Sequence, residues 1–263
     1  MSGIIKLDLL LDENKGQAIG VEFSELPTPN YLLTVAIDGR SCYTRAMKKI
    51  ISFDLDGTLV HGKYGDIVWN QGIPEEYARK YGMPFEDAKR LIRAQYEEVG
   101  EANIEWYHIE LWLRKFDLPV SAKTLLDRYE SYIELFPDTK DVLEALMETY
   151  TLIIASNAAR IFVEKELTYA NLTSHFTHII SATSDYCMVK KEAGFYEKLC
   201  ATLNVSPHEL VHVGDHRVFD FETPSRLGID AYHFVPDQQE VCDQSQGNNG
   251  KTIYRLSDLL DKI

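Results

Sequence analysis

The chain has 263 residues, of which 45% are hydrophobic, a length and composition that suit one large α/β domain or a core with a smaller domain and exclude global disorder. Its 27 Lys and Arg residues stand against 41 Asp and Glu residues, which gives a formal net charge of −14. Nucleic acids and anionic membranes bind basic surfaces, so we expect neither as a partner, whereas a small anionic substrate is compatible with this charge if a local cation offsets it.

The four cysteines favour a reduced, cytoplasmic protein. They are far apart and none belongs to a Cys-x-x-Cys pair, so we expect neither a disulfide framework nor a zinc site. The first residues lack the basic start and unbroken apolar stretch of a signal peptide. No apolar run has the length that a membrane span needs.

Residues 1–46 form a predicted β-rich extension. Short apolar runs at 7–11, 18–23 and 31–37 are separated by turn residues, a pattern that indicates an antiparallel meander. The stretch carries no motif with chemistry, so we expect an accessory module packed on the main domain. Self-association through this extension is an alternative, and the sequence leaves the oligomeric state open.

The next apolar run, residues 50–53, predicts a buried parallel strand. Asp54, Asp56, Gly57 and Thr58 follow it, and the glycine and threonine indicate a turn. Two carboxylates at the end of a buried strand repel each other unless a cation or a shared proton compensates. This unfavourable pair is the first sign of a functional site.

Helical patterns then fill residues 66–136, after a predicted loop at 61–66. Helix-start prolines and acids, helix-end glycines and apolar residues at helical spacing delimit four segments. The expected helices span residues 74–82, 84–100, 103–116 and 121–135. The stretch is therefore a predicted helical insert in a core made of residues 47–65 and 137–263.

Beyond residue 137, strands and helices alternate, and a short final helix is expected to begin at a Ser257 cap. The expected strands span residues 152–155, 178–180, 210–213, 231–235 and 252–254. This alternation predicts an α/β fold with a doubly wound parallel sheet. Such folds place their sites at the carboxyl ends of strands, so Asp54, Ser156 and Asp215 should converge on one crevice.

The residue types at these strand ends suit phosphoryl transfer. Asp54 can attack an electrophile as a carboxylate nucleophile, while Asp56 can protonate the leaving oxygen and later activate water. Asp54 and Asp215 offer the hard oxygen ligands that Mg²⁺ prefers. Ser156 can donate to a phosphoryl oxygen, and Lys190 can neutralise the charge that nucleophile and phosphate share.

Two further groups are candidates for the site. Asp220, five residues after Asp215, could hold a metal-bound water or orient Lys190. Aromatic residues of the insert could line its side of a pocket, although aromatic residues on amphipathic helices more often belong to the core. These residues are Trp69, Trp106, Tyr107 and Trp112.

Together these residues resemble the four motifs of the haloacid dehalogenase-like (HAD) hydrolase superfamily. The motifs occur in the same order as in that superfamily, and the resemblance covers residues 47–263. The similar stretches are 54–59 (DLDGTL) for the first motif, 154–157 (IASN) for the second, Lys190 for the third, and 213–215 (VGD) with Asp220 for the fourth. The insert resembles the cap domain that these enzymes place between the first two motifs.

The resemblance implies a Rossmann-like core with a helical cap, and Mg²⁺-dependent phosphoryl transfer through an aspartyl-phosphate. Asp54 would be the nucleophile, and Asp56 the general acid/base whose backbone carbonyl also binds the metal. Thr58 would support the loop around the nucleophile, and Thr58, Ser156 and Asn157 would contact the substrate.

Two positions depart from the superfamily's pattern. The third motif usually reads Lys-Pro-x-Pro, whereas residues 190–193 are Lys-Lys-Glu-Ala, so Lys191 could serve in place of Lys190. A small serine is common after the Gly-Asp of the fourth motif, and this chain has His216 there. Neither departure removes a functional group that the chemistry requires.

The leading prediction is a Mg²⁺-dependent phosphatase acting on a small phosphorylated metabolite. A metal-independent haloacid dehalogenase has no leaving oxygen to protonate, so Asp56 argues against that alternative. A sugar phosphomutase on the same fold stays open, while the intact motif set argues against a regulatory protein that works through residues 1–46. The sequence does not identify the substrate, and its specificity should lie in residues 66–136.

Overall fold

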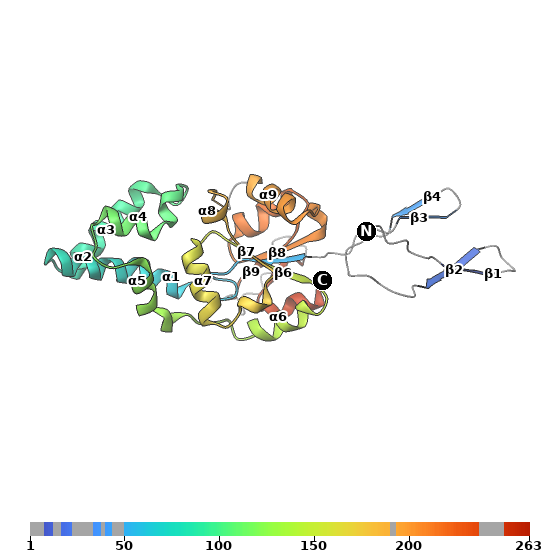
Figure 1. The fold of residues 1–263 in the computed structure, drawn as a ribbon, viewed down its shortest axis with the longest axis horizontal. Coiled ribbons are helices and arrows are strands. Elements are labelled where there is room, and N and C mark those ends of the chain that lie inside the picture. Colours follow the sequence, from blue (N-terminus) through green and yellow to red (C-terminus); the bar gives the residue numbers. More distant parts are fainter. Residues whose placement is uncertain are drawn as a thin grey trace, which may run out of the picture. The chain divides into compact units, whose positions relative to one another are not determined.

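The computed structural model describes residues 50–189, 193–236 and 250–263, and the backbone of four strands in residues 1–49 (Figure 1). Two compact units make up the chain, Met1–Ala46 and Met47–Ile263. The limits of the helical insert at residues 66 and 136 stay predictions.

The larger unit is built on a six-stranded parallel sheet, which confirms the predicted α/β fold. Its strand order is β10-β9-β8-β5-β6-β7. All strands expected in this unit are present, with small differences at their ends. They are β5 (Ile50–Phe53), β6 (Thr151–Ser156), β7 (His178–Ser181), β8 (Leu210–Gly214), β9 (Asp230–Phe234) and β10 (Thr252–Ile253).

Alternate strand residues face two separate hydrophobic layers. Phe53 of β5 points into the layer that holds α6 (Thr139–Met147) and α7 (Arg160–Tyr169). Ala155 of β6 belongs to the layer with α9 (Ala193–Leu203). Figure 1 shows α6 and α9 on opposite sides of the strands. The sheet is doubly wound because parallel strands with apolar residues on both sides must be covered on both faces.

Shorter helical segments complete the core. They are the α-helices α8 (Ala182–Asp185) and α10 (Thr223–Arg226), the 3-10 helices Thr173–His175, Pro207–Glu209 and Leu256–Asp261, and the π-helical segment Arg217–Glu222. The predicted cap at Ser257 is wrong, because the last of the 3-10 helices begins after Arg255. The Asp258 carboxylate fixes this start by accepting from the backbone N–H groups of Tyr254 and Arg255 at 2.9 and 3.0 Å.

The helical insert is present and shares one continuous hydrophobic core with α6 and α7. Its segments are α1 (Lys63–Ile67), a π-helical stretch (Val68–Gly72), α2 (Ile73–Tyr81), α3 (Phe85–Val99), a 3-10 helix (Ile104–Tyr107), α4 (Ile109–Lys115), α5 (Ala122–Arg128) and a 3-10 helix (Glu130–Tyr132). The C-terminal glycine caps predicted for two of these helices are confirmed at Gly82 and Gly100.

Three expectations about the insert are corrected. The first helix begins at Lys63, inside the predicted loop, and not at Pro74. From α1 the chain continues through the π-helical stretch into α2 without a break. Pro74 lacks an N–H and falls where α-helical hydrogen bonding resumes, so it does not mark the start of the helix. The expected helix 103–116 is broken at His108, which is extended. Trp112 holds this break, since its Nε1–H donates to Glu105 O at 3.0 Å. The expected helix 121–135 ends at Arg128.

In the smaller unit the described strands form two separate antiparallel pairs, β1 (Asp8–Asp12) with β2 (Gln17–Glu22) and β3 (Thr34–Ile37) with β4 (Arg40–Tyr43). The β-rich prediction is confirmed, but the single meander is wrong. Asp-Gly between β3 and β4 is a two-residue hairpin signal, so β3 pairs with the residues that follow it. Within the described parts of the chain, no helix has both the length and the apolarity to cross a membrane.

Candidate active site

The turn after β5 carries two carboxylates. Asp54 is buried and continues the sheet, since its N–H donates to Val213 O at 2.9 Å. The chain reverses at Gly57, whose φ is +81° and whose N–H donates to Val60 O at 2.7 Å. Asp56 precedes the glycine and is half-buried. A left-handed backbone favours glycine, so the local sequence fixes where both acids stand.

The turn after β8 carries two more carboxylates. Asp215 is exposed, and Asp220 is buried. Oδ2 of Asp220 accepts from the N–H of His216 at 3.1 Å, and its Oδ1 lies 3.1 Å from Nε2 of the buried His212. A Cβ on Gly214 would stand 2.5 Å from Cβ of Asp220, so only glycine leaves room for this carboxylate. Asp220 is therefore held in one orientation against the strand end.

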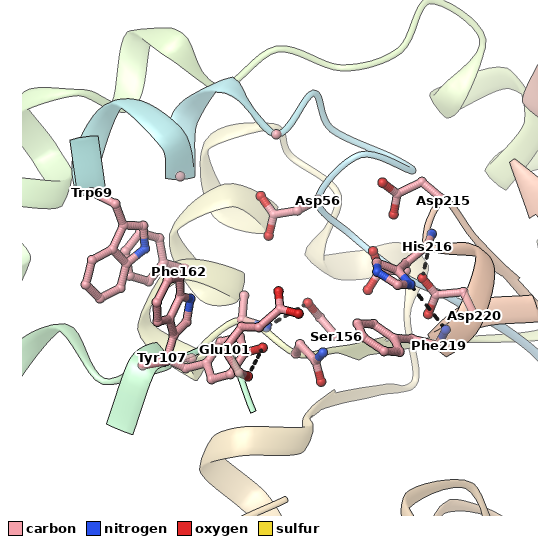
Figure 2. A pocket seen from close by; sticks show the side chains of 17 residues that line it. Asp56, Trp69, Glu101, Tyr107, Ser156, Phe162, Asp215, His216, Phe219 and Asp220 are labelled. Carbon is pink, nitrogen blue, oxygen red and sulfur yellow. Dashed lines mark hydrogen bonds between the residues drawn. The ribbon is translucent and has the colours of Figure 1, made fainter. Parts of the chain in front are cut away.

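Carboxylate oxygens of Asp54, Asp215 and Asp220 lie within 4.8 Å of one another. Figure 2 shows Asp215 and Asp220 side by side at one end of the cavity. Three anions this close repel one another unless a cation lies among them, and an all-oxygen set fits a hard divalent ion. This cluster can hold a metal ion. The side chain of Asp56 does not belong to it, while Asp220, for which the sequence indicated an indirect role, does.

The end of β6 supplies the second polar wall. Ser156 is buried, and its Oγ accepts from the N–H of Ala158 at 3.1 Å. The backbone carbonyl of Asn157 accepts from Oγ1 of Thr183 at 2.9 Å. Both Ser156 and Asn157 line the same cavity as Asp54. One bond within the turn and one from α8 fix the turn, so that its polar side chains stay at the strand end.

One cavity of about 370 Å³ joins these strand ends to the helical insert. Asp54, Asp56, Ser156 and Asp215 all line it, so the expected convergence of the strand ends is confirmed. In Figure 2, Asp215 and Asp220 lie at one end of the cavity, and Trp69 lies at the other. The volume falls within the range of about 300–1,000 Å³ that is usual for small-molecule sites.

The sequence profile of the family described as haloacid dehalogenase-like hydrolase matches residues 48–228, more than half of the chain. The chain belongs to the haloacid dehalogenase-like hydrolases. This membership confirms the predicted family and the predicted hydrolase class, and it agrees with the parallel sheet and its helical insert.

Individual relatives of this HAD-like hydrolase include the GMP/IMP nucleotidase YrfG of Escherichia coli strain K12, which is 26% identical over 180 residues, 68% of this chain and 79% of that protein. A HAD phosphatase from Thermococcus onnurineus shares the fold with a TM-score of 0.69 and 22% identity, over 81% of this chain and 97% of that one. A 2-haloacid dehalogenase from Pseudomonas syringae pv. Tomato DC3000 gives a TM-score of 0.60 and 21% identity, over 82% and 97%.

The aromatic end of the cavity in this HAD-like hydrolase comes mostly from the insert. Trp69, Trp106 and Tyr107 line it together with Phe162 of α7. The rings of Trp69 and Phe162 are stacked, with centroids 5.8 Å apart and planes inclined by 13°. Trp112, which the sequence did not distinguish from these residues, is fully buried in the core. The insert thus supplies a flat apolar wall opposite the carboxylates.

Sequence reasoning missed several lining residues, among them Glu101 and Phe219. Glu101 lies just beyond the glycine that ends α3, in a stretch without a motif, and its carbonyl accepts from Tyr107 Oη–H at 3.0 Å. Phe219 stacks on His216, with ring centroids 3.5 Å apart and planes inclined by 4°. In the sequence, this part of the cavity wall was indicated only by His216, which stands where a serine is common after the Gly-Asp of the fourth motif.

A carboxyl that sequence reasoning also missed lies behind Asp56. Glu166 of α7 is completely buried, and neither of its oxygens has a hydrogen-bond partner among the described residues. Burial raises its pKa well above the ordinary value of 4.5, and the negative charges of Asp56 and Asp54 raise this pKa further. Burial and the neighbouring carboxylates thus favour the neutral form of Glu166.

The remaining predicted site residues are Thr58 and the active-site lysine. Thr58 is buried and is not among the residues that line the cavity, and its Oγ1 has no hydrogen-bond partner within the described part of the chain. Its placement suits support of the loop better than contact with a substrate. Lys190 and Lys191 lie outside the described residues, so the choice between them as the active-site lysine stays a prediction.

Proposed function

We propose that this HAD-like hydrolase is a Mg²⁺-dependent phosphatase that acts on a small phosphate ester. The observation that carries the proposal is the cluster of Asp54, Asp215 and Asp220, whose oxygens lie within 4.8 Å of one another in a cavity that Asp56 also lines. The oxygen-only donor set fits Mg²⁺. When bound, Mg²⁺ would shield the Asp54 carboxylate from the negative phosphoryl group, which it otherwise repels.

In this proposal Asp54 attacks phosphorus and forms an aspartyl-phosphate as the bond to the leaving oxygen breaks. Asp56 gives its proton to that oxygen, so that the product leaves as an alcohol. A water molecule then attacks the phosphoryl group while Asp56 takes back a proton, which releases inorganic phosphate and restores Asp54. Ser156 and Asn157 line the cavity, where they can donate to phosphoryl oxygens. Lys190 would neutralise the shared charge.

The shape of the cavity supports a nucleotide-sized substrate. Its aromatic end, with Trp69, Trp106 and Tyr107, offers flat apolar surface well suited to a ring, and its carboxylate end suits the phosphate through the metal. The Escherichia coli relative is a GMP/IMP nucleotidase. We therefore take a purine nucleoside monophosphate as the substrate class.

Haloacid dehalogenase and sugar phosphomutase activities are the alternatives on this fold. Attack on carbon needs neither three clustered carboxylates nor an acid at Asp56, and the presence of both in the cavity favours phosphate. The likeness to a dehalogenase structure concerns the fold alone. A phosphomutase would return the phosphoryl group to a sugar, which phosphorus NMR of the products distinguishes from hydrolysis.

The test uses the purified full chain with p-nitrophenyl phosphate and nucleoside monophosphates, with Mg²⁺ or with EDTA. We expect phosphate release that needs Mg²⁺, that falls at least about 1,000-fold in Asp54→Asn, as expected for a lost nucleophile, and that is unchanged in Asp141→Asn, an exposed aspartate of α6. Full activity in Asp54→Asn, or in EDTA, would overturn the proposal. Halide release without metal would favour the dehalogenase.

A further inference from the structure

Glu101 is the one carboxylate of the helical insert among the residues that line the cavity. It is exposed and follows Gly100, the residue that ends α3. The aromatic residues Trp106 and Tyr107 line the same cavity, and Tyr107 Oη–H donates to the backbone carbonyl of Glu101 at 3.0 Å. Figure 2 shows Glu101 beside Tyr107, on the side of the cavity away from Asp215 and Asp220.

The charge of Glu101 restricts what it can contact in a phosphate ester. An ionised carboxylate only accepts hydrogen bonds, so it cannot bind the phosphate dianion directly. It also lies outside the cluster of Asp54, Asp215 and Asp220 that suits a metal ion. The part of a substrate that meets Glu101 must therefore carry N–H or O–H donors, or a positive charge. Because Trp106 and Tyr107 line the same cavity as Glu101, a flat ring with N–H groups along one edge suits both the aromatic surface and the carboxylate.

We propose that Glu101 selects 6-oxopurine nucleotides by accepting hydrogen bonds from the Watson–Crick edge of the base. This inference rests on the proposed phosphatase function and names a specificity-determining residue for it. Guanine presents N1–H and its 2-amino group side by side, which suits a bidentate carboxylate. Hypoxanthine presents N1–H alone. Adenine presents an acceptor at N1, which faces a carboxylate unfavourably because both groups are acceptors.

From the hydrogen-bond donors that each base offers to Glu101, we expect kcat/KM to be highest for GMP, lower for IMP and lowest for AMP. Stacking against the aromatic wall is common to all of them and does not discriminate, since every base has an apolar face. Ribose 5-phosphate has no base, so its hydrolysis reports the phosphate end of the cavity alone.

The experiment compares the full chain with Glu101→Gln and with Glu105→Gln, an exposed glutamate of the neighbouring 3-10 helix that does not line the cavity. An amide offers one acceptor and one donor, so it matches guanine poorly and tolerates adenine. We expect Glu101→Gln to lower kcat/KM for GMP by about 10- to 100-fold, as the loss of bonds to a charged acceptor implies, and to leave ribose 5-phosphate within about twofold. Glu105→Gln should match the wild type.

Three outcomes would overturn the inference while the phosphatase function stands. These are equal rates for GMP and AMP in the wild type, an unchanged GMP preference in Glu101→Gln, and equal losses for GMP and ribose 5-phosphate. Preference for phosphocholine would likewise overturn it, because a carboxylate among aromatic rings also suits a quaternary ammonium group. Absence of phosphate release from every ester, p-nitrophenyl phosphate included, would instead refute the proposed function on which the inference rests.

Discussion

Gly57 packs directly against Asp215 across two neighbouring strand ends. A Cβ built on Gly57 would stand 2.7 Å from Cγ of Asp215, closer than any two such carbon atoms can approach. The turn that follows the nucleophile and the exposed carboxylate of the metal cluster thus share one small space. Any side chain at position 57 must displace Asp215, and this links the first sequence motif to the fourth.

Gly57→Ala should therefore abolish most activity while it destabilises the fold only moderately. The backbone at Gly57 has a φ of +81°, which costs roughly 1–2 kcal/mol for a residue with a Cβ. Gly228 has a φ of +86°, and a Cβ added there would meet no other atom within 4 Å, so Gly228→Ala carries the same strain without the collision. We expect similar losses of melting temperature in both variants, and a fall in kcat of at least about tenfold in Gly57→Ala alone. Equal activity in the two would contradict the link to Asp215.

Asp220→Asn should weaken metal binding. Its carboxylate is buried, oriented by His212 and His216, and part of the cluster with Asp54 and Asp215. We expect the Mg²⁺ concentration that gives half of the full thermal stabilisation to rise by about 10- to 100-fold, because one of three anionic ligands becomes neutral. Differential scanning fluorimetry at increasing MgCl₂ measures this without any substrate. Asp261→Asn, at an exposed site, is the control, and an Asp220→Asn curve that overlays it would exclude Asp220 as a ligand.

Glu166→Gln should stabilise the protein increasingly as the pH rises. The folded-state pKa of Glu166 lies well above its ordinary value of 4.5. Between these two pKa values, the folded protein holds a proton on Glu166 that the unfolded chain has lost. Folding stability therefore falls with pH above about 4.5, by about 1.4 kcal/mol per pH unit, until the folded pKa is passed. Glutamine has nearly the same shape and no charge to lose, so it removes this dependence.

The measurement is the melting temperature of Glu166→Gln and wild type between pH 4.5 and 8, in EDTA so that metal binding does not contribute. The difference should be near zero at pH 4.5 and grow by about 2–4 °C for each kcal/mol of the linkage. Glu164→Gln, an exposed neighbour on α7, should show no such growth. A difference that is constant across the pH range would mean that Glu166 titrates alike in the folded and unfolded states.

Local patterns predicted the core of this fold well. The apolar runs at 50–53, 152–155 and 210–213 became β5, β6 and β8, and Asp54, Ser156 and Asp215 lie at or just beyond their carboxyl ends. Such patterns act over a few residues, since burial of a strand and the conformation of a turn depend on neighbours in the chain. Predictions failed where a particular side-chain contact interrupts a regular pattern, as at the break in helix 103–116, where the Trp112 side chain reaches back to Glu105.

The sequence by itself determined the chemistry at the strand ends, because parallel strands bring their carboxyl ends to one edge whatever covers the sheet. Only the tertiary structure decided how Asp220 joins Asp54 and Asp215, and that Glu166 lies buried behind Asp56. It also decided that Glu101 and Phe162 line the cavity while Trp112 does not. Helical spacing shows that a side chain faces an apolar environment, but whether that environment is core or cavity depends on how the insert packs against the sheet.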